Sequence, residues 1–154
     1  MLDRKANNQN IGSCKGDIPI TNLYTVGIAG QKFFEALKDK GEFLGTRCNK
    51  CETTYVPARY FCERCFAELR EYIKVSDKGE IVSFTVVYKD LDDKHLAEPK
   101  VVGAIKLDGA DTVLIHFINA TPAKVSIGKK VKAVLEPKAK RKGAITDIRF
   151  FELA

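Results

Sequence analysis

Residues 42–67 read EFLGTRCNKCETTYVPARYFCERCFA and contain two Cys-x-x-Cys pairs. Cys48 and Cys51 form the first pair, Cys62 and Cys65 form the second, and ten residues separate the pairs. Each pair can form a tight turn that directs two sulfurs at one ion, and a hairpin between the turns would bring four thiolates into a tetrahedron. The segment has too few apolar residues to build its own core, so bound metal would supply its folding energy. We therefore predict a closed, structural Zn²⁺ site with these four ligands and no position open to substrate.

Two other interpretations of the cysteines remain open at this stage. Iron in a rubredoxin-like centre accepts the same four sulfurs. A redox dithiol would use one pair, although no thioredoxin-like βαβ pattern surrounds either. A disulfide framework is less favoured, because the chain has five cysteines and its first residues, MLDRKANNQNIG, lack the apolar stretch of a secretory signal. We expect a cytoplasmic protein.

The two cysteine pairs lack one feature of ordinary zinc knuckles. Glycine commonly follows the second cysteine, where the backbone turns sharply, whereas Glu52 and Phe66 occupy these positions here. All four ligands remain, so we expect metal binding to be unaffected.

The residues before the ribbon divide into an arm and a helix. Residues 1–28 are polar and have no strand or helix periodicity, which predicts an N-terminal arm. Residues 29–41 are predicted to form a helix, because Phe33, Phe34 and Leu37 recur at helical spacing. This stripe is typical of a helix that covers a core. The adjacent Phe33 and Phe34 are also candidates for a docking face toward another chain.

Residues 68–154 have the pattern of a β domain. Five or six short strands, rich in β-branched and aromatic residues, follow one another at spacings of about 10 to 15 residues. The first is expected over residues 69–75, and no convincing long helix interrupts the series. This spacing fits a small antiparallel barrel and a mainly β fold class.

One strand of this domain is informative about partners. Over residues 81–88, strict alternation would place Ile81 and Ser83 on one face and Val82 and Phe84 on the other. A barrel that binds single-stranded nucleic acid displays aromatic residues among Lys and Arg on one wet face. Here the aromatic face is aliphatic as well and lacks basic residues, which predicts a strand covered on both sides or one that meets a protein partner.

The charge of the chain favours an anionic partner. Its 26 Lys and Arg outnumber 20 Asp and Glu, giving a formal charge of +6. Four thiolate ligands contribute −4 and a zinc ion +2, so the metal-loaded chain would carry about +4. The last loop concentrates positive charge in Lys138, Lys140, Arg141 and Lys142. Such a loop is either a solvated hairpin tip or a contact for phosphate.

The sequence contains no catalytic constellation. His95 lies in a polar loop, and His116 lies within a strand, where a satisfied structural histidine is expected. Cys14 is a lone thiol without an adjacent base. No apolar run approaches the roughly 18 residues that a membrane-spanning helix needs. We expect no chemistry from this chain alone and no membrane partner.

Several segments together resemble one known family. They are Phe33-Phe34-Glu35, Gly45-Thr46-Arg47-Cys48, Tyr55-Val56-Pro57-Ala58-Arg59, Gly79-Glu80-Ile81-Val82-Ser83-Phe84-Thr85-Val86-Val87, Pro99, Ile127-Gly128-Lys129-Lys130-Val131 and Phe150-Phe151. The chain resembles the zinc-ribbon plus OB-fold family first catalogued as a domain of unknown function, whose members accompany thiolases and related acyl-CoA enzymes. This resemblance implies an arm over 1–28, a helix over 29–41, a rubredoxin-like zinc ribbon over 42–67 and a five-stranded OB-fold barrel over 68–154.

The resemblance also implies a role. The chain would be a non-catalytic subunit bound to a thiolase that carries the catalytic residues, acting as a lid toward the coenzyme A site. Lys138, Lys140, Arg141 and Lys142 would then contact the adenosine-phosphate end of CoA, and Phe33 and Phe34 would dock to the thiolase. Within the family, the arm and helix are most similar to subunits of bacterial degradative thiolases, in particular the one of anaerobic toluene degradation, which implies a benzoylsuccinyl-CoA-type substrate and aromatic catabolism.

Two alternatives belong to other functional classes. A single-stranded nucleic-acid-binding protein would also combine a zinc ribbon, a barrel and a basic surface. A free-standing acyl-CoA carrier or hydrolase would need a catalytic role for Cys14 or His116.

Overall fold

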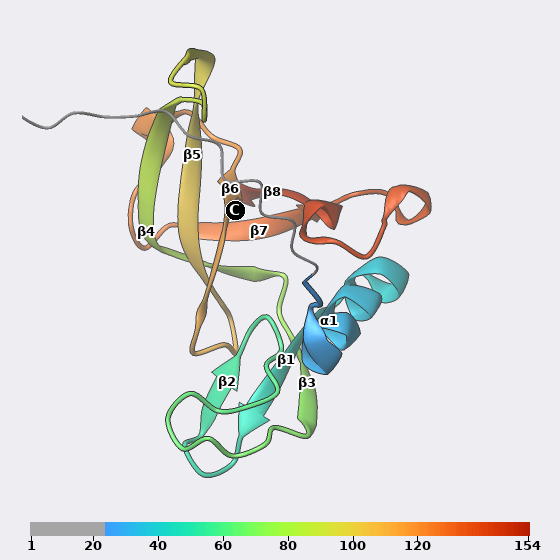
Figure 1. Cartoon of the computed structure of the whole chain (residues 1–154). Coiled ribbons are helices and arrows are strands. Elements are labelled where there is room, and N and C mark those ends of the chain that lie inside the picture. Colours follow the sequence, from blue (N-terminus) through green and yellow to red (C-terminus); the bar gives the residue numbers. More distant parts are fainter. Residues whose placement is uncertain (1–23) are drawn as a thin grey trace, which may run out of the picture.

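The computed structural model describes residues 24–154 and places one α-helix beside two β-sheets (Figure 1). Most of the predicted arm, including Cys14, lies outside these residues. No helix within the described range is long and apolar enough to span a membrane.

Helix α1 (Gly27–Lys40) forms where the sequence predicts it. Its buried stripe consists of Ala29, Phe33 and Leu37, at helical spacing. The helix ends at Gly41, whose φ of 70° is the left-handed conformation that glycine adopts without steric cost. The N–H groups of Gly41 and Glu42 donate to the carbonyls of Leu37 and Ala36, which satisfies two carbonyls of the last turn.

The zinc ribbon is built on a three-stranded antiparallel sheet. Its strands are β1 (Phe43–Cys48), β2 (Thr53–Tyr55) and β3 (Glu71–Val75), in the order β2-β1-β3. The strand predicted at 69–75 was expected in the barrel, and the structure pairs it with β1 instead, from Phe43 opposite Val75 to Arg47 opposite Glu71. This register brings the buried Phe43 and Val75 together, so the sheet of the ribbon extends eight residues past residue 67.

The second sheet is the predicted five-stranded barrel. Its strands, in chain order, are β4 (Lys78–Lys89), β5 (His95–Leu107), β6 (Val113–Ile118), β7 (Lys130–Leu135) and β8 (Ile148–Leu153). They close in the order β4-β5-β6-β8-β7, with β7 pairing back onto β4. All pairs are antiparallel except β6 with β8, which are parallel and meet at one residue pair, Ile118 with Phe151. Short 3-10 helices lie at Pro122–Lys124, Lys138–Lys140 and Ile145–Asp147.

A β-bulge in β4 changes the alternation that the sequence predicts. The pairing with β5 shifts between Ile81 and Ser83. The extra residue reverses the facing of the rest of the strand, so Phe84 and Val86 pack against the core that contains Ile81, whereas Val82 and Ser83 are exposed. Within residues 24–154 the outer face of β4 is open, so the first alternative, a strand covered on both sides, is wrong. The second, a strand that meets a protein partner, stays a prediction.

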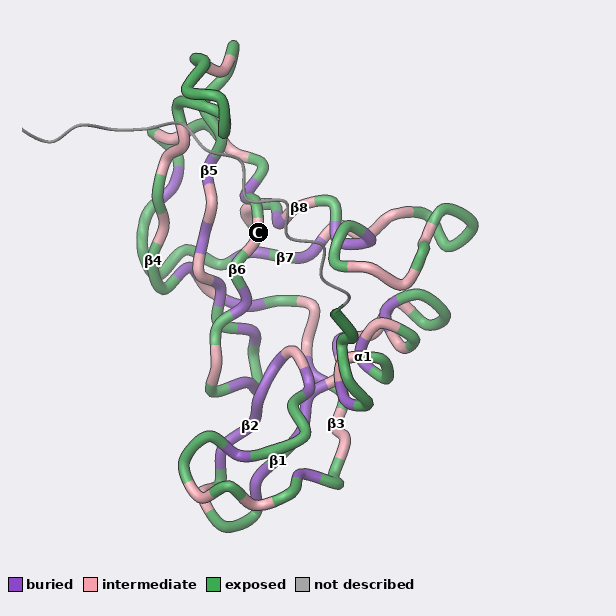
Figure 2. Tube along the Cα trace, viewed as in Figure 1, coloured by how far each residue is buried: buried purple, intermediate pink, exposed green. Residues whose placement is uncertain are grey.

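One hydrophobic core joins the helix, the ribbon and the barrel (Figure 2). Phe33 of α1, Phe43 of β1 and Phe151 of β8 are fully buried, and their ring centroids follow one another at 6.4 and 6.5 Å. Burial of each such side chain contributes roughly 1.5–3 kcal/mol. Because three elements share this core, the ribbon and the barrel stabilise each other.

A polar clamp fixes the ribbon to the barrel. Between β5 and β6, the Asp111 carboxylate accepts a hydrogen bond from the Thr54 N–H at 2.8 Å, and the Asp111 N–H donates to the Thr54 carbonyl. The hydroxyl of the following residue, Thr112, accepts a hydrogen bond from the Val56 N–H at 2.9 Å and donates one to the Val56 carbonyl at 3.0 Å. These four bonds use the backbone of β2 and of the residue directly after it, and they orient the metal-binding turns.

Candidate functional site

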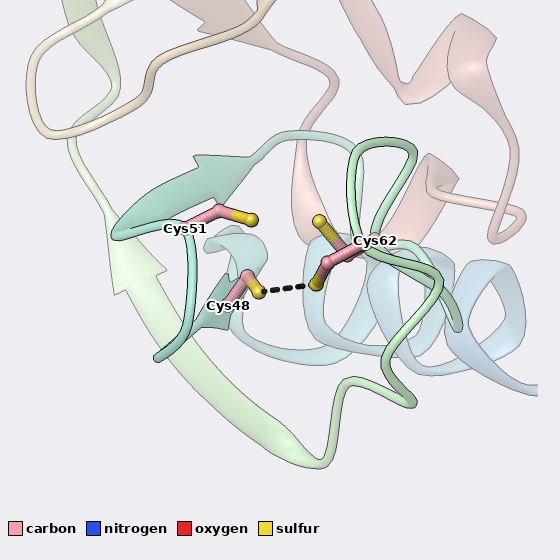
Figure 3. Close-up of side chains that lie close together, drawn as sticks. Cys48, Cys51 and Cys62 are labelled. Atoms are coloured by element: carbon pink, nitrogen blue, oxygen red, sulfur yellow. Dashed lines mark hydrogen bonds between the residues drawn. The ribbon is translucent and has the colours of Figure 1, made fainter.

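The structure brings the four predicted ligands together in one cluster. The Sγ atoms of Cys48, Cys51, Cys62 and Cys65 all lie within 4.8 Å of one another, and those of Cys48 and Cys65 are 3.6 Å apart. Figure 3 labels three of the four, Cys48, Cys51 and Cys62. A tetrahedral Zn²⁺ with Zn–S bonds of about 2.3 Å requires sulfurs about 3.8 Å apart. The cluster therefore fits a closed four-sulfur zinc site. No other group of three or more potential ligands converges anywhere in residues 24–154.

The backbone holds both cysteine pairs in the knuckle conformation despite the missing glycines. Glu52 and Phe66 have φ values of 52° and 56°, in the left-handed region. In the second turn, the Phe66 N–H donates to the Cys62 carbonyl at 3.0 Å, and the Cys62 N–H donates to the Ala67 carbonyl at 2.9 Å. A left-handed conformation costs a non-glycine residue roughly 1–2 kcal/mol. The two turns thus keep the backbone conformation that places the cysteines around a metal, although this conformation is unfavourable for Glu52 and Phe66.

The four thiols differ in burial and in acidity. Cys48 and Cys62 are fully buried, and Cys51 and Cys65 are half-buried. A hydrogen bond from the Tyr55 hydroxyl lowers the pKa of Cys62 to about 6, assisted by the N–H groups of Cys65 and Arg64 and opposed by burial.

The opposite shift occurs at Cys51, whose pKa rises to about 12 because it is hydrogen-bonded to Cys65 and partly desolvated. Metal binding requires all four sulfurs to be deprotonated, so the donors around Cys62 favour the form that binds the metal, whereas the surroundings of Cys51 oppose it.

A groove on the barrel is a second candidate site. It has a volume of about 680 Å³. It lies where β6 and β8 diverge from their single pairing, and the 3-10 helix Ile145–Asp147 borders it. Its lining is mostly apolar and comprises Val102, Ile115, His116, Phe117, Glu136, Ile145, Thr146, Ile148, Arg149 and Phe150. The size and apolar character are typical of ligand sites.

This groove was not predicted from the sequence, although β6 contains a signal for it. Val113, Ile115 and Phe117 are exposed, whereas Leu114 and Ile118, which alternate with them and point to the other face, are buried. A strand at the surface that is apolar on both faces has one face available for contact with something else.

His116 lies in this groove, and at one of its two ring nitrogens it departs from the satisfied structural histidine that the sequence predicts. Its Nδ1 atom is buried and has no hydrogen-bond partner among the described residues. Burial lowers the pKa of His116 below its ordinary value, and backbone hydrogen bonds with Ile145 and Phe117 oppose this shift without cancelling it. His95, by contrast, is exposed at the start of β5.

The four basic residues of the last loop occupy two different environments. Lys138, Lys140 and Lys142 are exposed and form no ion pair within residues 24–154. Arg141 is half-buried, and its guanidinium donates to the Glu136 carbonyl at 2.7 Å and to the Leu37 carbonyl at the end of α1 at 3.4 Å. Three lysines thus remain for an external anion, and Arg141 has an internal role.

The two predicted docking residues, Phe33 and Phe34, also differ in their exposure to solvent. Phe33 is fully buried against Phe43, so it presents no surface to another chain, and the docking prediction continues only for Phe34. Phe34 is half-buried and lines a smaller hollow of about 370 Å³ together with Lys142 and Ile145. Since Ile145 also lines the groove on the barrel, the hollow and the groove adjoin.

A four-cysteine ribbon joined to a closed five-stranded barrel defines a zinc-ribbon plus OB-fold protein. Comparison with protein families agrees with this class. The rubredoxin-like zinc ribbon domain of ChsH2 matches residues 36–70, and the C-terminal OB-fold domain of ChsH2 matches residues 72–136. The four cysteines are therefore a structural zinc site, rather than an iron centre or a redox dithiol.

Curated relatives identify the family. The chain is 31% identical over 99 residues to a DUF35 domain-containing scaffold protein of Methanocaldococcus jannaschii, which covers 64% of this chain and 70% of that protein. It is 29% identical over 91 residues to a protein of the same description from Methanothermobacter thermautotrophicus, which covers 58% of this chain and 68% of the relative. The chain belongs to the DUF35 family of scaffold proteins.

Solved structures share the fold. A DUF35-family protein of unknown function from Sulfolobus solfataricus superposes with a TM-score of 0.66 at 26% identity, over 83% of this chain and 87% of that one. A chain of the Ltp2–ChsH2(DUF35) aldolase superposes with a TM-score of 0.61 at 20% identity, over 85% and 98%.

Proposed function

We propose that this chain is a non-catalytic scaffold subunit of an enzyme complex that acts on acyl-CoA thioesters, and that it docks to the catalytic subunit and helps to form the CoA site. The observation that carries the proposal is the position of the basic loop beside the groove. Glu136, Ile145 and Thr146, which flank the loop on both sides, line the groove, while Lys138, Lys140 and Lys142 stay exposed. An elongated ligand with a phosphate-bearing end and a less polar end fits such a site.

We further propose that the catalytic partner is a thiolase and that its substrate is an aromatic acyl-CoA thioester. The scaffold description of the relatives, and an aldolase complex that contains a chain of this fold, support a catalytic subunit as the partner. The family resemblance of the sequence supports a thiolase as that subunit and an aromatic acyl group, of the benzoylsuccinyl-CoA type, as its substrate.

Affinity purification of the full chain from its own cells, followed by mass spectrometry, tests the docking. We expect one acyl-CoA enzyme subunit in a fixed ratio, and thiolase activity in the complex but not in the isolated chain. A chain that remains alone at every concentration tested would overturn the proposal.

Titration of the purified complex with CoA tests the site. Replacement of Lys138, Lys140 and Lys142 by alanine should weaken CoA binding by about tenfold or more, because each lysine–phosphate contact is a charge-assisted hydrogen bond. The matched control replaces three other exposed lysines, Lys78, Lys129 and Lys132, which line neither the groove nor the hollow. Equal affinity in both triple variants would mean that the loop does not bind the phosphates.

Binding of single-stranded nucleic acid is the second candidate, and one observation favours it. Lys100 lies over the Phe117 ring at 5.7 Å, and Arg149 lies over the Phe150 ring at 5.3 Å, on a face that OB-folds commonly use for ligands. Glu136 neutralises Arg149 at 3.3 Å, which weakens this face for phosphates. Binding of single-stranded oligonucleotides that falls steeply with salt would support this candidate, and a flat isotherm at low salt would remove it.

A further inference from the structure

Tyr55 is a buried aromatic residue at the end of β2, beside the metal-binding cysteines. Its side chain is fully buried and packs in a small cluster with Cys48, Cys62 and Leu69. Its hydroxyl oxygen lies 3.2 Å from the Cys62 sulfur, within hydrogen-bond distance for sulfur. A buried phenol needs a hydrogen-bond partner, and this sulfur provides one.

The direction of this hydrogen bond follows from the metal. A cysteine that binds Zn²⁺ has lost its proton, so its sulfur can only accept. The Tyr55 hydroxyl must therefore donate. A donor at this sulfur withdraws negative charge from it and restricts its orientation, which is how outer groups act on ligands at other metal sites.

The four ligand sulfurs differ in whether a side chain donates a hydrogen bond to them. Cys62 is fully buried and receives the hydroxyl of Tyr55. The half-buried Cys51 and Cys65 have no side-chain partner in the described chain other than the cysteines themselves. A reagent that attacks zinc-bound thiolates thus meets two accessible sulfurs without a protecting donor, at Cys51 and Cys65. Of the two buried sulfurs, that of Cys48 has only another cysteine as its side-chain partner, and that of Cys62 has a donor as well as burial.

We infer that Tyr55 is a positioning residue of the zinc site, which holds the Cys62 sulfur by a hydrogen bond and makes it the ligand that is last to react and last to leave the metal. Zinc release by electrophiles then begins at Cys51 or Cys65. Removal of an outer-shell partner typically costs 10–100-fold in metal affinity, and we expect a loss in that range from Tyr55→Phe, which removes the hydroxyl and keeps the ring.

The experiment compares zinc-loaded full chains. Transfer of zinc to an excess of a metallochromic chelator should be about 10–100-fold faster from Tyr55→Phe than from the unmodified chain. Tyr60→Phe is the matched control, because the Tyr60 hydroxyl also lies in the ribbon but donates to Glu68, at 2.6 Å, and not to a sulfur. Release from Tyr60→Phe should stay within about twofold of the unmodified chain. Equal release rates in the two variants would overturn the inference.

Two further measurements separate positioning from a general loss of stability. In the Co²⁺-loaded chain, Tyr55→Phe should move the thiolate-to-cobalt charge-transfer bands to lower energy, because the Cys62 sulfur becomes a stronger donor, whereas Tyr60→Phe should leave them in place. In the unmodified zinc protein, limited N-ethylmaleimide followed by peptide mass spectrometry should label Cys51 or Cys65 before Cys62. Labelling of Cys62 first, or unmoved bands in Tyr55→Phe, would each contradict the role given to the hydroxyl.

Discussion

Glu52 and Phe66 adopt left-handed backbone conformations that residues with a side chain rarely hold. Both are exposed, so neither side chain gains burial in return. The conformation costs roughly 1–2 kcal/mol, whereas glycine would lose roughly 0.5–1 kcal/mol of backbone entropy on folding. We therefore predict that Glu52→Gly and Phe66→Gly each stabilise the zinc-loaded chain by up to about 1 kcal/mol.

Urea unfolding at fixed free zinc checks this prediction. Lys50→Gly is the matched control, because Lys50 is exposed in the same turn and is not among the residues with positive φ. It should destabilise by roughly 0.5–1 kcal/mol. Destabilisation of the same size by Glu52→Gly would show that the left-handed conformation carries no strain.

Asp147 is the buried carboxylate that organises the basic loop. It accepts hydrogen bonds from the N–H groups of Lys142, Gly143 and Ala144 at 2.8, 2.7 and 3.3 Å. Burial alone would raise the pKa of Asp147, but these three donors and the charge of Arg141 outweigh it and hold the pKa below its ordinary value. A depressed folded-state pKa contributes stability that is present above the unfolded value of about 3.9 and is lost as the pH falls through the folded value.

Asp147→Asn should therefore destabilise the chain by about 1–3 kcal/mol at neutral pH, and this difference should shrink below about pH 4. Unfolding of both proteins between pH 7 and 3 measures it. Both lose zinc in acid, so the informative quantity is the difference between them. A difference that stays constant with pH would mean that the charge of Asp147 is not what holds the loop.

At the scale of elements, Arg141 links the last loop to the end of α1. Its guanidinium lies against the carbonyls of Leu37 and Lys38, where the negative end of the helix dipole favours a cation. We predict that Arg141→Ala destabilises the chain by about 1–2 kcal/mol and speeds amide exchange in the last turn of α1. Lys140→Ala, at an exposed neighbour, should change neither quantity. If Arg141→Ala leaves α1 unchanged and weakens CoA binding, the residue serves the ligand instead.

The sequence predicts elements well where the signal is local. The cysteine spacing predicts the ribbon, and the stripe that contains Phe33 and Leu37 predicts α1. Pairing between distant segments is harder to predict from the sequence, because strand periodicity does not say which sheet a strand joins. For this reason β3 was expected in the barrel, whereas it pairs with β1 of the ribbon. The groove arises in the same way, since it depends on how β6 and β8 diverge after one pairing, more than thirty residues apart in the chain. Arg141 resembles a phosphate ligand in the sequence, and only its contact with a helix 104 residues away gives it a structural role.

For the whole molecule, the zinc ion stabilises more than the ribbon that binds it. Phe43 and Val56 belong to the ribbon and to the common core, and the clamp of Asp111 and Thr112 depends on the position of β2. Loss of the metal should therefore loosen α1 and the surface where ribbon, helix and barrel meet. The strands β5 and β6 keep their own pairing and are the part best able to remain folded.

Cys48→Ser and Cys62→Ser test this dependence. Each variant should lose zinc, because a closed site needs all four sulfurs, and apparent zinc binding supplies on the order of 10 kcal/mol to such ribbons. Hydrogen exchange should then show unprotected amides in residues 42–67 and in β3, faster exchange in α1, and slower exchange in β5 and β6. Co-purification with the catalytic partner should be lost.

Chelation of the unmodified chain should give the same exchange pattern. Addition of zinc should then restore protection in the unmodified chain, but not in the serine variants. A serine variant that remains folded, zinc-loaded and bound to its partner would refute the ligand assignment, whereas uniform loss of protection in the barrel would show that the molecule unfolds as a single unit.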